Sequence, residues 1–181
     1  MKIQLLLLLM LLFFACGNRQ KIAKELSQLQ SECIVLPKQS QLTIQGKDTV
    51  WMDFMRDGRL KLLVYTDSTG CSSCTINKMY MWDSLIEYSK VYKGNLKFYF
   101  IFSPGKQDEE SVRIALQSHA FDYPVLIDTL GEFEKLNPHL PENKALHTFL
   151  LDENNNVILV GNPLYNKKIE QMFYDMTKKR L

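Results

Sequence analysis

The most chemically distinctive residues of the chain are two cysteines, Cys71 and Cys74, with Ser72 and Ser73 between them. They follow an apolar segment and a polar turn, which is typical of the start of a helix. A helix that begins at this pair keeps both sulfurs close together, and its dipole and free N–H groups stabilise a thiolate on the first cysteine. A thiolate is the nucleophile of thiol–disulfide exchange, so the spacing predicts a redox pair in which Cys71 attacks and Cys74 resolves the mixed disulfide.

A C-x-x-C pair also has two purely structural uses. One is a structural disulfide, although so short a loop adds little stability through chain entropy. The other is half of a zinc site, but the sequence contains no second C-x-x-C motif and no H-x-x-H motif that would complete a closed structural site. For the redox pair we expect Cys71 to be partly exposed, and Cys74, inside the first helical turn, to be more buried.

Alternating strands and helices surround the cysteine pair. Apolar runs of the buried-strand type alternate with segments in which apolar residues recur every three or four positions. This order predicts an α/β domain with parallel strands and one antiparallel hairpin near its end. The expected strands are Leu60–Thr66, Leu96–Phe102, Pro124–Asp128, Thr148–Leu151 and Val157–Val160, and the expected helices run from the cysteine pair to about Tyr92 and over Asp108–His119, Gly131–Leu136 and Lys167–Lys179.

Two further segments precede this region. Asn18–Glu32 is polar with a few apolar residues at helical spacing, which predicts a tether helix or spacer. Leu42–Ile44 and Val50–Met52 are short extended stretches with turn residues between them, which predicts an N-terminal hairpin or a pair of edge strands.

The first residues have the pattern of a bacterial lipoprotein signal peptide. A basic start is followed by an unbroken apolar run, Leu5–Ala15, and then by Cys16 and a polar segment. As a helix this run rises about 16 Å, roughly half of a bilayer core, so it cannot span a membrane, but it has the length of a signal-peptide core. Its end resembles a lipobox, which predicts a mature chain that starts at Cys16 and carries diacylglycerol and fatty acyl chains such as palmitate. Such a protein is anchored to a membrane of the bacterial cell envelope and faces the periplasm, where disulfides persist.

The composition excludes several classes of protein. The chain has 181 residues, of which 46% are hydrophobic and 23% are charged, as in a globular domain and unlike a disordered chain or a polytopic membrane protein. A net charge of +2, from 22 Lys and Arg against 20 Asp and Glu, gives no basis for nucleic-acid binding. No cofactor is predicted, and the expected partners are cysteine-containing envelope proteins and a separate redox partner.

The segment from about Leu60 to Leu181 resembles thioredoxin-like domains, in particular those of TlpA-like and AhpC/TSA-like proteins. The strand ahead of the C-S-S-C motif carries this resemblance, together with Pro124–Asp128 and the following Gly131–Phe133, and Thr148–Asp152 with the following Val157-Ile158. The resemblance implies a thioredoxin-like fold, with a central mixed β-sheet flanked by helices and a short N-terminal β extension. It also implies thiol–disulfide oxidoreductase activity of the cysteine pair. The predicted parts of the chain are a signal peptide over 1–15, a tether over 16–33 and a thioredoxin-like domain over 34–181 whose motifs lie within 60–181.

Three positions depart from these families. Gly70 precedes the first cysteine where tryptophan is usual, and Ser72-Ser73 replaces the usual Gly-Pro or Pro-Pro pair. His147-Thr148 stands in place of the dipeptide whose cis-proline faces the two sulfurs. An imidazole there has three interpretations: it stabilises the Cys71 thiolate when protonated, it joins Cys71 and Cys74 as a ligand of a soft metal when neutral, or it is only a loop residue.

The same residues leave alternative functions open. These are a copper- or zinc-binding thioredoxin-like module, a peroxiredoxin-like peroxidase and a redox-inactive binding domain. For the peroxidase, Ser68 fits the hydroxyl position of that family, but Val64 stands where the family has proline. Cys33 is expected to be a small buried residue, with intermolecular pairing as the alternative, and His119 and His139 are expected to be solvated.

Labelling with a fatty-acid analogue tests the predicted lipidation of Cys16. The wild-type protein should take up the label and Cys16→Ala should not, because the diacylglycerol is attached to this sulfur. Cys33→Ala removes a different cysteine and should keep the label. A mature N-terminus at any other residue would contradict the prediction.

Overall fold

The computed structural model describes residues 19–37, 40–52, 58–119 and 121–181. The predicted signal peptide and the predicted lipidation site Cys16 lie outside the described residues. Among the helices within these ranges, none has both the length and the apolar character that crossing a bilayer requires.

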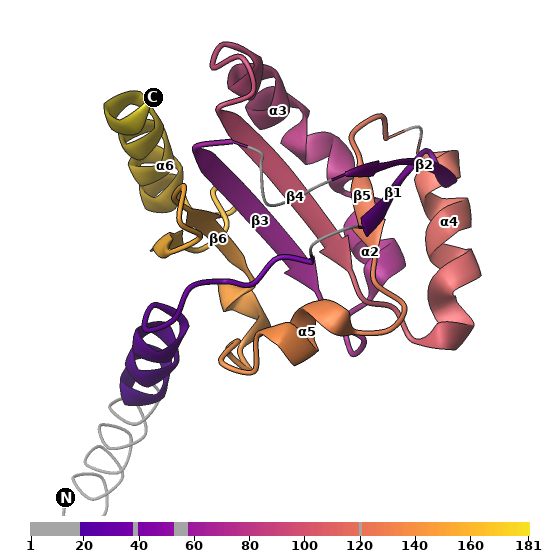
Figure 1. The fold of residues 1–181 in the computed structure, drawn as a ribbon, viewed down its shortest axis with the longest axis horizontal. Coiled ribbons are helices and arrows are strands. Elements are labelled where there is room, and N and C mark those ends of the chain that lie inside the picture. The colour runs from indigo at the N-terminus through magenta and orange to yellow at the C-terminus, as the bar shows by residue number, and fades with distance from the viewer. Residues whose placement is uncertain (1–18, 38–39, 53–57, 120) are drawn as a thin grey trace, which may run out of the picture.

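Within the described residues, seven strands form one mixed sheet in the order β2-β1-β5-β4-β3-β6-β7 (Figure 1). Strands β3 and β4, and likewise β4 and β5, pair in parallel, while the other neighbours pair antiparallel. The predicted central mixed sheet with a late antiparallel hairpin is confirmed. The strands are β1 Ser40–Ile44, β2 Lys47–Met52, β3 Leu60–Thr66, β4 Leu96–Phe102, β5 Val125–Ile127, β6 Thr148–Leu151 and β7 Val157–Val160.

The central strand β3 sends buried side chains to both faces of the sheet. Leu60, Leu62 and Val64 belong to one core cluster, and Leu63 and Tyr65 belong to the other. Successive residues of a strand point to opposite faces, so a strand that is covered on both sides is predominantly apolar instead of alternating apolar and polar. β3 follows this rule except at Lys61, which is buried and donates to the Asp152 carbonyl at 3.4 Å, and at its last residue, Thr66.

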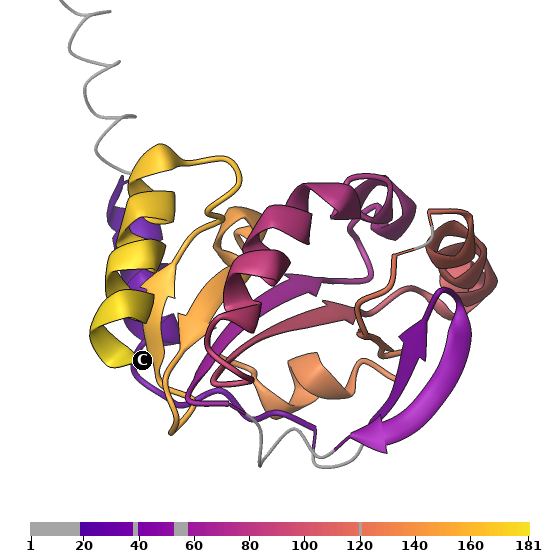
Figure 2. The same ribbon diagram turned by 90° about the horizontal axis from the view of Figure 1, so that it is seen from above.

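Helices cover both faces of the sheet, with α3 and α5 on opposite sides (Figure 2). Val112 of α4 and Phe173 of α6 join the same core cluster as Leu85 of α3, whereas Phe133 of α5 joins the second cluster. The helices are α2 Ser72–Ile76, α3 Asp83–Lys90, α4 Glu109–Ser118, α5 Glu132–Leu136 and α6 Lys167–Arg180, with 3₁₀ turns at Met79–Trp82, Lys106–Asp108 and Lys144–Leu146.

The helix predicted from the cysteine pair to about Tyr92 is divided into α2, a 3₁₀ turn and α3. The N–H groups of Lys78 and Met81 each donate to a carbonyl three residues back, which tightens the chain between the two α-helices. Residues three apart eclipse one another in such a turn, and Met79 and Trp82 are both buried. The segmentation therefore brings both large side chains to the core.

The N-terminal strands β1 and β2 form an antiparallel hairpin, and β1 also pairs with β5. The predicted N-terminal pair of strands is confirmed as an extension of one sheet edge. Gly46 in the hairpin turn has φ +76°, and a Cβ there would lie 2.5 Å from the carbonyl oxygen of Arg113 in α4, so the turn requires glycine. The Arg113 guanidinium also donates to the Asp48 carboxylate at 2.6 Å and holds the pKa of Asp48 below its usual range.

Residues 19–29 are helical, and the chain that follows them lies against the domain. Leu29 is fully buried in the second core cluster. The buried Asn137 side chain accepts a hydrogen bond from the N–H of Val35 at 2.7 Å and donates one to its carbonyl at 2.9 Å. The later part of the predicted tether thus packs as part of the folded unit.

The same helix contacts the segment that precedes β6. Lys21 Nζ lies 3.3 Å from the Glu142 carboxylate, and the N–H of Asn143 donates to the Glu25 carboxylate at 3.3 Å. Lys21 and Glu25 also form an ion pair one helical turn apart, at 3.7 Å. These contacts hold the N-terminal helix beside residues 142–143.

Two expectations about single residues in this region are wrong. Cys33 is exposed rather than buried, because the neighbouring Ile34 takes the position that faces the core. His139 is buried rather than solvated, and its Nδ1 lies 3.7 Å from the Glu32 carboxylate. His119, at the end of α4, is exposed as expected.

Leu29→Ala should lower the free energy of unfolding by about 2–5 kcal/mol, because it leaves a cavity where the N-terminal helix packs on the domain. Urea unfolding of the purified protein measures this loss. The neighbouring exposed residue Gln28 supplies the control, since Gln28→Ala should stay within about 0.5 kcal/mol of the wild type. Equal stabilities for the two variants would show that the helix does not pack there.

Candidate functional site

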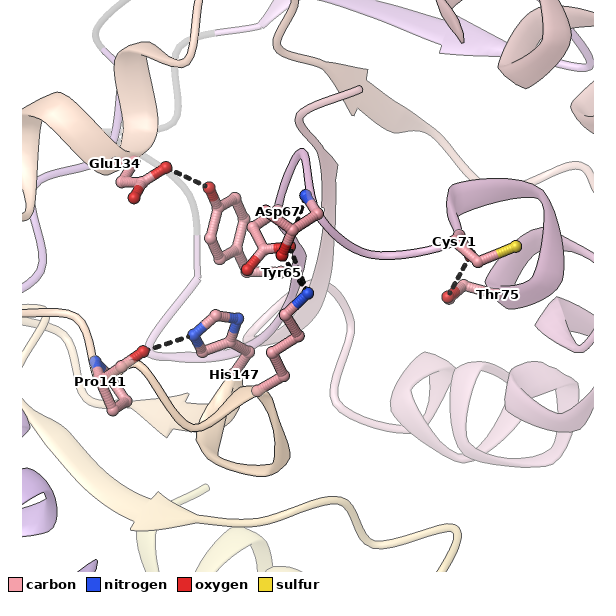
Figure 3. Close-up of polar contacts among 9 residues, drawn as sticks. Tyr65, Asp67, Cys71, Thr75, Glu134, Pro141 and His147 are labelled. Carbon is pink, nitrogen blue, oxygen red and sulfur yellow. Dashed lines mark hydrogen bonds and ion pairs between the residues drawn. The ribbon is translucent and has the colours of Figure 1, made fainter. Parts of the chain in front are cut away.

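Cys71 lies at the start of α2, on the chain that continues from the carboxyl end of β3 (Figure 3), and Cys74 follows within that helix. Cys71 and Cys74 are joined by a disulfide, with an S–S distance of 1.99 Å and a Cα–Cα distance of 5.2 Å. Cys71 is the N-cap residue of α2, and Cys74 lies in the first turn. The predicted placement of the pair at a strand-to-helix junction is confirmed.

Hydrogen bonds distinguish the two sulfurs. Cys71 Sγ accepts the backbone N–H of Cys74 at 3.2 Å, and the Ser73 hydroxyl lies 3.6 Å from the same sulfur. The carbonyl of Cys71 accepts the N–H of Thr75 at 3.1 Å, which closes the first helical bond of α2. Hydrogen bonds to a charged group favour its charged form, so this arrangement favours a thiolate on Cys71 after reduction.

Both cysteines are accessible to solvent. Cys71 and Cys74 are each exposed, so a place inside the first helical turn does not bury Cys74. The buried residues of α2 are Ser72 and Ile76, four positions apart and therefore on one side of the helix. Cys74 stands midway between them in sequence, which turns its side chain to the opposite side.

A hydrogen-bonded turn leads into the pair. The Asp67 carboxylate accepts both the N–H and the hydroxyl of Thr69 at 3.0 Å, and the Asp67 carbonyl accepts the N–H of Gly70 at 3.1 Å. Lys144, from the segment before β6, forms an ion pair with Asp67 at 3.1 Å and donates to the Thr69 hydroxyl. Burial alone raises the pKa of a carboxyl group, but the hydrogen bonds and charge of Lys144 and the Thr69 bonds outweigh it, so the pKa of Asp67 lies below its usual value.

A cavity of about 340 Å³ opens beside the disulfide. Its walls come from β3, the turn that carries Asp67, the start of α2, the segment around His147 and the connection between β7 and α6, which contributes Tyr165. Tyr165 is 63% exposed. Both cysteines line this cavity, so a molecule bound in it lies beside the disulfide.

Comparisons with known proteins bear on the fold alone. No protein-family model matches the sequence, and no curated protein matches it either. Solved structures do match. The solution structure of a candidate protein disulfide isomerase from Bacteroides thetaiotaomicron shares 16% identity at a TM-score of 0.54, over 83% of this chain and 90% of that one. StoA from Bacillus subtilis shares 19% identity over 69% of this chain and 87% of that one at a TM-score of 0.49. A thioredoxin-like protein from Porphyromonas gingivalis shares 15% identity over 83% of this chain and 94% of that one, at a TM-score of 0.48.

The fold is thioredoxin-like. This confirms the fold that the resemblance implied, including the mixed sheet, the flanking helices and the N-terminal β extension. In this thioredoxin-like domain the cysteine pair lies where a strand meets a helix, as the sequence predicts.

His147 lies in the wall of the cavity, but its ring is directed elsewhere (Figure 3). Nε2 lies 2.7 Å from the carbonyl oxygen of Pro141 and therefore donates to it, and the ring packs 5.2 Å from the ring of Tyr65. The peptide bond to Thr148 is trans, as are all others within the described residues. In the disulfide form, His147 thus holds the segment before β6 in place, and its direct action on a Cys71 thiolate stays a prediction for the reduced form.

Metal ligation by His147 likewise stays a prediction. Within the ranges that the structure describes, no three His, Cys, Asp or Glu side chains gather as a ligand set. The sulfurs of Cys71 and Cys74 are bonded to each other here, and a disulfide sulfur is not the thiolate that binds metals. A metal site would therefore require both reduction and a turn of the imidazole.

Three cavity residues were not found from the sequence. Tyr65 donates to the Glu134 carboxylate at 3.4 Å, and burial raises the pKa of its hydroxyl. Asp67 with Thr69 has the spacing of an Asx turn, which is a local signal that the sequence does contain. Lys144 gives no such signal, because its partners lie more than seventy residues away in the chain.

His147→Ala should lower the free energy of unfolding by about 1–3 kcal/mol, because it leaves the Pro141 carbonyl without its donor and a void beside Tyr65. The rate of alkylation of reduced Cys71 should change little, since the imidazole is not directed at the sulfur. His119→Ala, at an exposed helix end, should alter neither quantity. A slowed alkylation at unchanged stability would instead support direct action of His147 on the thiolate.

Proposed function

We propose that this protein is a thiol–disulfide oxidoreductase that uses Cys71 and Cys74 to exchange disulfides with cysteines of cell-envelope proteins. The observation that carries the proposal is the exposed disulfide at the start of α2, whose first sulfur accepts the N–H of Cys74. A structural disulfide has no need of an exposed position or of a cavity beside it. A redox pair needs both, because a second protein has to bring its sulfur into line with the bond that breaks.

In the reducing direction, the Cys71 thiolate attacks one sulfur of the substrate disulfide. A bond forms between Cys71 and that sulfur, and the other substrate sulfur leaves as a thiolate. The Cys74 thiolate then attacks Cys71 Sγ, which forms the disulfide seen in the structure and releases the second substrate thiolate. The substrate gains two electrons and the protein loses two. In the oxidising direction the same steps run in reverse, and the reduction potential of the pair determines which direction prevails.

The envelope location rests on the first residues of the sequence. The apolar run Leu5–Ala15 followed by Cys16 supports export and lipid anchoring, which place the domain in a compartment where disulfides persist. The N-terminal helix over residues 19–29 then connects the anchor to the domain. The partners are cysteine-containing proteins of the same compartment and a second redox protein that restores the pair.

Cys74→Ser should accumulate mixed disulfides with a disulfide-containing model peptide, because Cys71 attacks and no thiol remains to resolve the product. Cys71→Ser should accumulate few mixed disulfides, because the N–H of Cys74 donates to Cys71 Sγ and no described residue offers a similar donor to Cys74 Sγ. Mass spectrometry after acid quenching measures both. Equal trapping by the two variants contradicts the assigned roles. Failure of the reduced wild-type protein to reduce the peptide contradicts the function itself.

A further inference from the structure

The path of the chain into Cys71 is fixed by the turn over residues 67–70. Asp67 accepts three hydrogen bonds within the turn, through its carboxylate from Thr69 and through its carbonyl from Gly70. Gly70 is tightly enclosed, since a Cβ there would lie 3.0 Å from Thr66 Cγ2 and 3.3 Å from the Asp67 carbonyl oxygen. A change in this turn therefore alters the position of the next residue, Cys71.

One side chain from a distant segment holds the turn. Lys144 Nζ lies 3.1 Å from Asp67 Oδ1 and also contacts the Thr69 hydroxyl, so the ammonium group bridges two of the four turn residues. The Asp67 side chain is 16% exposed and that of Lys144 is 48% exposed. A partly buried carboxylate without its cation would be left with an uncompensated charge, so the turn in this conformation depends on Lys144.

We propose that Lys144 is a positioning residue for the cysteine pair. Through its contacts with Asp67 and Thr69, Lys144 keeps Cys71 Sγ in place to accept the hydrogen bond from the N–H of Cys74. The proposal deepens the proposed function and rests on it. Lys144 does not take part in the exchange itself. Its role is to connect the segment before β6 with the turn before α2, beside the cavity that Lys144, Asp67 and both cysteines line.

The chemical consequence concerns the reduced form of the protein. The Cys74 N–H stabilises a thiolate on Cys71 only while the N-cap geometry holds, and stabilising the thiolate stabilises the dithiol form against the disulfide. Loss of the Lys144 contact should therefore shift the redox equilibrium toward the disulfide. In that equilibrium the two cysteine thiols and one oxidised glutathione give the Cys71–Cys74 disulfide and two reduced glutathiones, so two electrons and two protons pass to glutathione.

The experiment measures this equilibrium constant in glutathione buffers for the full-length protein. Lys144→Met keeps the aliphatic stem and removes the charge, and it should favour the disulfide roughly three- to tenfold more than the wild type. Lys144→Arg restores a cation that can bridge two oxygens and should recover most of the wild-type value. Asp67→Asn should shift the equilibrium in the same direction, and the double variant with Lys144→Met should shift it no further, because the two residues act as one unit.

Lys78→Met separates positioning from charge alone. Lys78 lines the same cavity and is exposed, so its replacement removes the same charge from the same surroundings without touching the turn. A smaller shift for Lys78→Met than for Lys144→Met supports the proposal, and equal shifts overturn it. A wild-type value for Lys144→Met also overturns it while leaving the proposed function intact. If the wild-type protein fails to exchange with glutathione or the model peptide, the proposed function fails instead.

Discussion

Strand β3 is hydrogen-bonded along both of its edges, to β4 in parallel and to β6 antiparallel. Its side chains are buried on both faces of the sheet, so the strand cannot shift without breaking two ladders and both core clusters. A buried backbone group left without a partner costs about 1–3 kcal/mol, and a shift would leave several. The turn, the cysteine pair and the cavity are all attached to the carboxyl end of this strand. The positions of the turn and the cysteine pair therefore depend on the position of β3.

The reactive pair combines exposed sulfurs with a firmly anchored helix. Ser72 and Ile76 are buried and fix α2 to the domain, whereas Cys71 and Cys74 are exposed to solvent. The helix is short, yet Met79 and Trp82 follow it directly into the core. Both cysteines are therefore accessible to a partner protein while the helix that carries them is held in place.

The sequence was most informative where burial imposes a pattern. The runs that became β3 and β4 were predicted because a strand covered on both faces is predominantly apolar. The antiparallel hairpin of β6 and β7 was predicted from the polar turn residues between two short strands. The division of the long predicted helix was not, because Met79 and Trp82 are three apart, a spacing that suits an α-helix and a 3₁₀ turn alike. The exposure of Cys74 followed from which residues of α2 face the core, and the contact of Lys144 with Asp67 depends on the assembled sheet. Neither the exposure of Cys74 nor the Lys144–Asp67 contact can be predicted from the neighbouring residues in the sequence.

Residues 142–144 serve two neighbours at once. The N-terminal helix contacts Glu142 and Asn143, and the turn before the cysteine pair is held by Lys144. With the chain tethered to a membrane through its N-terminus, as proposed, a pull on the tether is transmitted to this stretch through the N-terminal helix. The N-terminal helix and the turn before the redox centre are thus linked through three consecutive residues of the chain.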